Sequence, residues 1–164
     1  MTLLITTSKT PIGNLNLIAD EHVLLGANLS TLSALKSGLD VSDQAREFKV
    51  VKSIPIISDL IADYFDGDIS AINGISVRQP GATFSQAAWK VMRKVKAGAV
   101  ITYSDLASRA GSAAAVRAAG TACAKNAIML VVPCHRIVKS GGAIGNYAYG
   151  VNKKEWLLSH EGAL

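Results

Sequence analysis

The chain has 164 residues, of which 49% are hydrophobic and 18% are charged. This composition allows a sizeable buried core, in one large domain or two small ones. No run approaches the roughly 18–20 apolar residues that a membrane span requires, which argues against a membrane protein. The N-terminal residues lack the basic-then-apolar layout of a signal peptide, so we expect an intracellular, cytoplasmic protein.

The net charge of +5 is distributed unevenly along the chain. Residues 1–83 hold six Lys/Arg and nine Asp/Glu, a net charge of −3, whereas residues 84–164 hold eleven and three, a net charge of +8. Such asymmetry favours a polyanion, for example nucleic acid, as the ligand of the basic half. A merely well-solvated surface explains the same charges, and charge alone does not distinguish it from a surface that binds nucleic acid.

The chain has two cysteines, Cys123 and Cys134. An intracellular compartment keeps thiols reduced, which argues against a structural disulfide between them. The histidines His22, His135 and His160 are scattered and give no zinc-ligand spacing with these cysteines. We therefore expect neither a metal nor another cofactor.

The first half of the chain predicts short strands and one helix. Alternating or continuous apolar runs bounded by turn residues indicate the strands, and apolar residues at helical spacing indicate the helix. The predicted strands cover Leu3–Ile5, Leu15–Ile18, Val23–Leu25 and Ile75–Arg78, with Glu47–Val51 as a strand or connector, and the helix covers Ile56–Phe65.

A break at Gln79–Gly81 coincides with the change in charge. We therefore predict two domains, residues 1–79 and residues 80–164. The second is predicted to be mostly helical. Its predicted helices cover Phe84–Val95 (capped by Thr83), Ser104–Ala110, Ser112–Ala124 and about Asn152–Ser159, and an apolar strand-like run covers Ile128–Val132.

The two middle helices have the proportions of a helix-turn-helix unit. The second of them consists almost entirely of small residues, with Arg117 as its one long polar side chain. Such a helix has too few polar groups to read base edges, although it can approach a sugar–phosphate backbone closely. Arg117 would then be placed to probe the base stack. A tightly packed core helix with Arg117 at its rim is the alternative.

The segment Pro133-Cys134-His135-Arg136 carries the most distinctive chemistry. Nearby cations, here His135, Arg136 and Lys139, favour the nucleophilic thiolate, and a neutral His can accept the thiol proton. Glu161 is one of only three acids after residue 83, so it is a candidate to orient His135. The alternative is a structural cysteine beside a surface His and Arg.

Together these motifs resemble the O6-alkylguanine-DNA alkyltransferase (methylated-DNA–protein-cysteine methyltransferase) family. The similarity is weak near Thr10–Gly13 and Tyr64–Gly67 and continuous from Phe84 onward. The segments that carry it are Gly98–Tyr103, Ala115–Gly120, Asn126, Pro133–Val138, Gly145–Tyr147 and Lys154–Glu161, in the order and spacing of the family.

This resemblance implies an α/β fold with an RNase-H-like N-terminal domain and a mostly α winged helix-turn-helix C-terminal domain. It implies a monomeric DNA-repair protein that binds double-stranded DNA through the minor groove and flips O6-alkylguanine out of it. The alkyl group then passes irreversibly to Cys134, without a cofactor, in a single turnover. The alternative is a helix-turn-helix protein that recognises lesions or regulates genes without transfer; a Cys-His hydrolase is less favoured, because no obvious oxyanion hole accompanies Cys134.

The resemblance also implies roles for individual residues. Cys134 would accept the alkyl group, His135 would deprotonate it through a water molecule, Glu161 would orient His135, and Asn126 would brace the preceding turn. The residues expected to contact substrate or DNA are Tyr103, Ala115, Arg117, Arg136, Ile137, Tyr147, Ala148 and Tyr149.

Two positions depart from the family pattern. Tyr149 stands where many members have a small residue, so we expect a narrower pocket that accepts large O6 substituents poorly. Cys123 lies on the second helix where an apolar residue such as Met is common, and we expect it not to touch the core chemistry. The family's cysteine is present at position 134, where the alkyltransferase-like proteins have Trp, so transfer is expected to be intact.

Overall fold

A computed structural model describes residues 2–164, which form a mixed α/β protein of two compact units. The first unit comprises the residues up to Pro80 together with Ala127–Val131. The second comprises Gly81–Asn126 and Val132–Leu164. Among the residues described, no helix is both long and apolar enough to cross a membrane.

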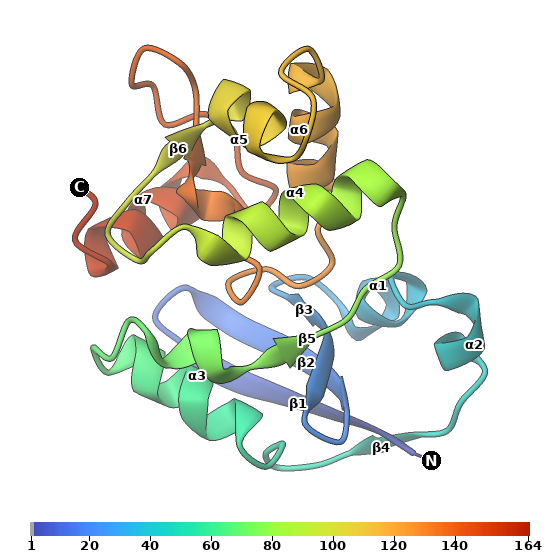
Figure 1. The fold of residues 1–164 in the computed structure, drawn as a ribbon. Helices are drawn as coiled ribbons and strands as arrows, with labels where there is room; N and C mark the ends of the chain where they lie inside the picture. The colour runs from blue at the N-terminus through green and yellow to red at the C-terminus, as the bar shows by residue number, and fades with distance from the viewer. Residues whose placement is uncertain (1) are drawn as a thin grey trace. The chain divides into compact units, whose positions relative to one another are not determined.

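A five-stranded mixed sheet forms the centre of the first unit (Figure 1). Its order is β4-β1-β2-β3-β5, with β1, β2 and β3 antiparallel and the edge strands parallel to their neighbours. The strands are β1 (Leu3–Thr10), β2 (Gly13–Asp20), β3 (Val23–Asn28), β4 (Phe48–Val50) and β5 (Ser76–Val77).

The first three strands are longer than the predicted apolar runs. Their added residues are largely polar, such as Thr7 and Asn14, and continue the backbone pairing between β1 and β2 down to Thr10 opposite Gly13. The apolar positions still decide which face is buried, because successive side chains alternate between faces. Leu3, Ile5, Ile18 and Leu25 form one buried cluster with Leu35 and Leu39.

The helices of this unit are α1 (Leu32–Ser37), α2 (Val41–Gln44) and α3 (Ile57–Phe65), with a short 3₁₀ helix, η1 (Ala71–Gly74). The sequence predicted α3 but neither α1 nor α2. These two have one or two turns each, too short for a helical apolar period, and the side chains of Thr31 and Asp40 cap them.

The predicted apolar strand Ile128–Val132 is only partly correct. The run makes a single parallel bridge, Ile128 to Ala27, with the backbone N–H of Ala27 donating to Ala127 O at 2.9 Å. Leu130 has a φ of 74°, which interrupts the extended backbone, so no regular strand continues. The backbone N–H of Ala127 also donates to the Gln79 side chain at 2.9 Å within this unit.

The second unit is mostly helical, with a small parallel two-stranded sheet (Figure 1). Its elements are α4 (Thr83–Lys94), β6 (Ile101–Thr102), α5 (Tyr103–Arg109), α6 (Val116–Ala124), the 3₁₀ helix η2 (Cys134–Arg136), β7 (Ile137–Val138) and α7 (Val151–His160). The indole N–H of Trp89 on α4 donates to the Ala122 carbonyl on α6 at 2.9 Å, which joins two helices of this core.

Three helix starts differ from the prediction. Thr83 is the first residue of α4 rather than its cap; Ala82 precedes it without a capping side chain. Helix α5 begins one residue early, at Tyr103, because Thr102 and Asp105 form a capping box. Helix α6 begins at Val116, with Ala115 as its N-cap, so residues 112–115 form a turn.

Candidate active site

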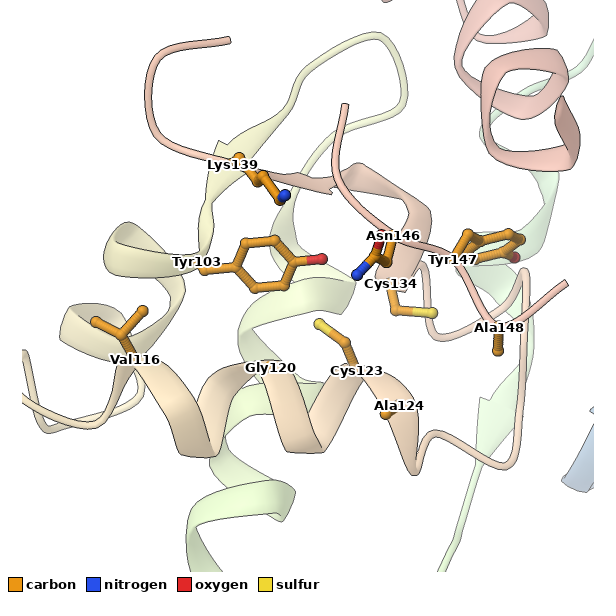
Figure 2. Close-up of a pocket in the computed structure, with 10 residues that line it drawn as sticks. All are labelled: Tyr103, Val116, Gly120, Cys123, Ala124, Cys134, Lys139, Asn146, Tyr147 and Ala148. Atoms are coloured by element: carbon orange, nitrogen blue, oxygen red, sulfur yellow. The ribbon is translucent and has the colours of Figure 1, made fainter. Parts of the chain in front are cut away.

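A cavity of about 450 Å³ in the second unit contains the side chain of Cys134 (Figure 2). Helices α5 and α6, the η2 turn and the loop before α7 supply its walls. Its lining residues are Tyr103, Val116, Gly120, Cys123, Ala124, Cys134, Lys139, Asn146, Tyr147 and Ala148. No Asp or Glu belongs to this lining, so its ionisable groups are two thiols, two phenols and one ammonium.

A tight turn at Pro133 places Cys134 at the start of η2. Pro133 has φ −84° and ψ 69°, and the Cys134 N–H donates to the Val132 carbonyl at 2.9 Å, which makes an inverse γ-turn. Proline lacks the N–H that a continuing strand would need. The chain therefore leaves the apolar run and presents Cys134, which is 7% exposed, at the cavity.

Asn126 connects the end of α6 with this turn. Its Nδ2 donates to the Val132 carbonyl at 2.8 Å and lies 3.5 Å from the Cys134 sulfur. Burial raises the pKa of the Cys134 thiol, and the Asn126 N–H and the Lys154 ammonium offset only part of that rise. The resting cysteine is therefore held as a thiol, and its activation requires a proton acceptor.

A buried chain of three charged or polar side chains lies beside Cys134. His135 Nε2 is 2.8 Å from Glu161 Oε2, while Arg136 donates from Nε to Oε1 at 2.9 Å and from a terminal nitrogen to Oε2 at 3.0 Å. Burial would raise the pKa of Glu161, but the hydrogen bonds from His135 and Arg136 outweigh it and lower that pKa to about 2. Glu161 is therefore a carboxylate at neutral pH.

The charge of Glu161 fixes the proton position on His135. A carboxylate only accepts hydrogen bonds, so His135 Nε2 carries the proton that Glu161 binds. Burial lowers the pKa of His135 below its usual 6.5, against the opposing effect of Glu161, so the ring is neutral. Its Nδ1 then has a free lone pair; this atom is buried and has no hydrogen-bond partner among residues 2–164. His135 Nδ1 is thus a poised proton acceptor.

The structure corrects the expectation that Arg136 contacts DNA or substrate. Arg136 is 1% exposed, and its third hydrogen bond, from a terminal nitrogen, goes to the Val95 carbonyl at 2.7 Å. A guanidinium with carboxylate and carbonyl partners inside the unit is not available to a ligand. Arg136 also contributes nothing to the shift of the Cys134 pKa; the cation that favours this thiolate is Lys154.

Lys154 is fully buried and ties the cavity loop to β7. Its ammonium donates to the Ile137 carbonyl at 2.6 Å and to the Asn146 carbonyl at 3.2 Å. Gly145, at φ +82°, lets the loop pass close by, since a Cβ there would lie 3.4 Å from both Lys154 and the Tyr103 ring. One buried cation therefore positions the loop that carries Asn146 and Tyr147.

Sequence reasoning did not assign this role to Lys154, although a signal was present. Lys154, Leu157, Leu158 and Glu161 follow the i, i+3, i+4, i+7 spacing of a buried helix face, and all four are buried. Charged residues on an apolar face are rarely buried without partners. Lys139, Val116, Gly120 and Ala124 were likewise not predicted to line the cavity.

The remaining predicted residues fall into those that line the cavity and those that do not. Tyr103, Tyr147 and Ala148 line the cavity, and Figure 2 shows the Tyr103 hydroxyl directed into it. Burial, followed by the negative charges of Cys123 and Cys134, raises the pKa of Tyr103 to about 12, so its hydroxyl stays protonated. Arg117 is exposed on α6, and Ala115 caps that helix.

Tyr149 does not belong to the cavity lining. Its ring packs edge-on against Tyr147, with centroids 5.6 Å apart. Burial, then the negative charge of Cys134, raises the pKa of Tyr149 to about 12. Cys123, in contrast, does line the cavity together with Cys134, which the sequence did not indicate. Within residues 2–164 no three His, Cys, Asp or Glu side chains gather where a metal ion could be held.

The buried His135–Glu161 pair predicts a loss of stability in acid. Both groups have lower pKa values in the folded chain than their usual 6.5 and 4.5, so the unfolded chain binds more protons on acidification. The free energy of unfolding should fall as the pH drops below about 6.5, and fall further between 4.5 and about 2 as unfolded carboxylates protonate. Urea denaturation at a series of pH values measures this.

A site-specific readout separates this pair from other acidic groups. The NMR signal of the His135 ring should show a midpoint of protonation below 6.5, the usual value of a histidine. A midpoint for His135 at or above 6.5 would contradict the neutral, buried imidazole.

Comparison with known proteins places this site in a family. The model of the 6-O-methylguanine DNA methyltransferase DNA-binding domain matches residues 83–163. The methylated-DNA–protein-cysteine methyltransferase of Shigella flexneri is 35% identical over 159 residues, which cover 94% of this chain and 93% of that protein. The protein of the same name from Salmonella typhimurium is 42% identical over 108 residues, which cover 66% of this chain. These residues span 63% of the Salmonella protein, which is less than two thirds of its length.

A solved structure agrees over the whole chain. Mycobacterium tuberculosis OGT in complex with DNA superposes with a TM-score of 0.80 at 26% identity, covering 98% of this chain and 93% of that chain. The similarity therefore includes both units and the segment with Cys134. The chain belongs to the methylated-DNA–protein-cysteine methyltransferase family.

Proposed function

We propose that this chain repairs double-stranded DNA by transferring an alkyl group from the O6 atom of guanine to its own Cys134. The observation that carries the proposal is the placement of Cys134 at a cavity, next to a neutral His135 whose other nitrogen is bound to Glu161. A thiol, a base and a group that orients the base are the parts of an activated nucleophile. Relatives over the whole chain carry the name of this activity.

The proposed reaction needs one displacement and the net movement of one proton from the thiol to guanine. His135 Nδ1 accepts the thiol proton, directly or through one water molecule, and Glu161 stabilises the imidazolium that forms. The Cys134 sulfur then attacks the alkyl carbon, its bond to guanine O6 breaks, and the departing guanine takes up a proton, which restores neutral His135. Tyr103, which stays protonated, donates a hydrogen bond to the leaving base. The thioether product is stable to ordinary thiols, so each molecule reacts once and needs no cofactor.

The guanine must leave the base stack to reach the cavity, because chemistry on a base requires its extrusion from the duplex. We assign α5 and α6 to the minor groove, with Ala115 at the start of the small-residue helix and Arg117 filling the place that the base leaves. Tyr147, Ala148 and the backbone of Ile137 hold the base. Asn126 braces the turn before Cys134, and Tyr149 supports Tyr147 by packing edge-on against it.

The proposal includes a finer description of the domains. We assign residues 1–79 to an RNase-H-like domain, to which Ala127–Val131 are added, and the rest of residues 80–164 to a winged helix-turn-helix domain. The mixed sheet of the first unit and the pair α5–α6 beside the β6–β7 sheet support this assignment. A monomeric state and a cytoplasmic location belong to the same proposal.

Mass spectrometry after incubation with a duplex that contains O6-methylguanine tests the function. The protein should gain one methyl group per molecule, mapped to the peptide with Cys134, and the duplex should regain unmodified guanine. A duplex with unmodified guanine is the control. Binding to the duplex without any mass gain would instead identify a lesion-recognition protein without transfer.

Replacing Arg117 by alanine should separate base flipping from chemistry. The variant should react with an O6-methylguanine duplex roughly 10- to 100-fold more slowly, since a lost stacking or wedge contact costs about 1–3 kcal/mol. Its reaction with the free alkylated base should be nearly unchanged, because no duplex has to open. Single-turnover rates on both substrates measure the effect.

Arg109→Ala is the matched control, since it removes an exposed arginine of the same charge from α5. Equal losses on duplex and free base in Arg117→Ala would remove its role in flipping. A loss of the same size in Arg109→Ala would assign the effect to overall charge.

A further inference from the structure

Cys123 is a second nucleophilic side chain in the cavity of Cys134. It lies in the last turn of α6, is a free, half-buried thiol and lines the same cavity. Both cysteines line this cavity, and Figure 2 shows the Cys123 sulfur on the side of the Tyr103 hydroxyl and the Cys134 sulfur on the side of Ala148. Methyl transfer as proposed above uses only Cys134, so Cys123 has no role in that reaction.

The two thiols influence each other electrostatically. Burial, then the negative charge of Cys134, raises the pKa of Cys123, whereas the Lys154 ammonium lowers it. Alkylation makes Cys134 a thioether, which cannot ionise, so a later deprotonation of Cys123 meets no competing thiolate at Cys134, while the Lys154 ammonium remains. The thiolate is the nucleophilic form of Cys123.

We propose that Cys123 is an internal trap for alkyl groups that carry a second leaving group, such as a 2-haloethyl group on guanine O6. This inference rests on the proposed function and extends its substrates to bifunctional alkyl adducts. After transfer, the haloethyl group on Cys134 points into the cavity from which the guanine departs. Cys123 lines that cavity.

The steps conserve atoms and involve no oxidation. Cys134 sulfur first forms a bond to the carbon on guanine O6, the C–O bond breaks, and the proton from the Cys134 thiol ends on the released guanine. The same sulfur then displaces the halide from the second carbon and forms a three-membered episulfonium ring. Cys123 sulfur attacks one ring carbon, one C–S bond to Cys134 breaks, and the Cys123 proton leaves to solvent. The product is an ethylene bridge between the two sulfurs, with loss of hydrogen halide.

The position of Cys123 decides which nucleophile reacts second. A thiol in the same cavity has a high effective concentration relative to water or a DNA base, as is general for preorganised intramolecular reactions. Without it, the episulfonium would react with water or with the bound DNA, and the latter would cross-link the protein to the duplex. Cys123 thus protects the DNA from the product of the repair reaction.

Intact-mass and peptide analysis after reaction with a freshly chloroethylated duplex, separated from the reagent, tests the proposal. The wild-type chain should gain one C2H2 unit, with the Cys123 and Cys134 peptides joined. In Cys123→Ser, Cys134 should instead carry a hydroxyethyl group, and the protein–DNA cross-linked fraction on a denaturing gel should rise several-fold. Each variant is also incubated with an O6-methylguanine duplex, which shows that it is folded and transfers a methyl group to Cys134.

The outcomes separate the two proposals. A wild-type product with a hydroxyethyl group on Cys134 and no bridge would overturn the trap and leave alkyl transfer intact. Absence of any adduct on Cys134 from both duplexes would overturn the proposed function itself. If Cys123→Ser fails to react with the methylated duplex, Cys123→Ala takes its place, and the wild-type mass alone still decides whether the bridge forms.

Discussion

Replacing Cys134 by serine is expected to lower alkyl transfer by roughly 10⁴-fold or more, as when the only nucleophile of a reaction is removed. A serine hydroxyl fits the place of the thiol, but it is a far weaker acid, and His135 is neutral with a lowered pKa, so it cannot deprotonate a hydroxyl to a useful extent. The thioether bond that makes the transfer irreversible cannot form either.

Transfer of a radiolabelled methyl group from an O6-methylguanine duplex to protein measures this effect. Binding of the Cys134→Ser variant to the same duplex should persist, because the substitution alters neither α6 nor the basic surface of the second unit. In Cys123→Ser the label should still appear, and peptide mapping should find it on Cys134. Substantial label on Cys134→Ser would show that another side chain is the acceptor.

Glu161→Gln is expected to destabilise the chain by about 3–5 kcal/mol, as for other buried ion pairs that lose one partner. Glu161 accepts from both His135 and Arg136 and is fully buried with them. A neutral amide would leave the Arg136 guanidinium buried without a counter-charge. In the wild-type chain both carboxylate oxygens, Oε1 and Oε2, accept hydrogen bonds from N–H groups. The NH2 group of a glutamine would replace one of these oxygens, so its N–H donors would face the N–H donors of Arg136 or His135.

Chemical denaturation of the variant and of Glu155→Gln measures the difference. Glu155 lies on the same helix, α7, and is exposed, so its replacement removes an equal charge without opening a buried pair. We expect Glu155→Gln to change the stability by less than about 0.5 kcal/mol. Equal effects of the two substitutions would show that the buried network does not stabilise the fold.

Transfer by any folded Glu161→Gln protein should also be slower, since a glutamine no longer fixes which nitrogen of His135 carries the proton. The rate of methyl transfer per folded molecule reports this effect separately from stability. Retention of the full rate would assign Glu161 to stability alone.

Sequence patterns predicted the parts of the site that depend on local chemistry. The scarcity of acids in the basic half singled out Glu161, which does bind His135. The same patterns misplaced Arg136. A cation next to a cysteine in sequence need not face it, because successive residues of a 3₁₀ turn point in different directions.

Other features depend on contacts between distant segments and were not predictable from local patterns. Lys154 influences Cys134 from α7, twenty residues later in the chain, and Cys123 lines the cavity from the last turn of α6. The helices α1 and α2 were missed because caps and tertiary packing, rather than an apolar period, stabilise such short segments. Four of the five strands of the first sheet were predicted and Glu47–Val51 was left as a strand or connector; the apolar runs of β2 and β3 stand out because most of their residues are buried on both faces of the sheet.

Because Ala127–Val131 belong to the first unit, the two units cannot be obtained as separate fragments by one cut in the chain. The chain passes between the units after Pro80, after Asn126 and after Val131, so a single cut near residue 80 does not separate two independent pieces. A fragment that begins there would keep Ile128, Met129, Leu130 and Val131, all buried in the whole chain, but would lose the strand that Ile128 pairs with. Four consecutive apolar residues would become solvent-exposed a few positions before the acceptor cysteine. The C-terminal half would carry every residue of the site and would still be a poor substitute for the full chain, because it would tend to aggregate.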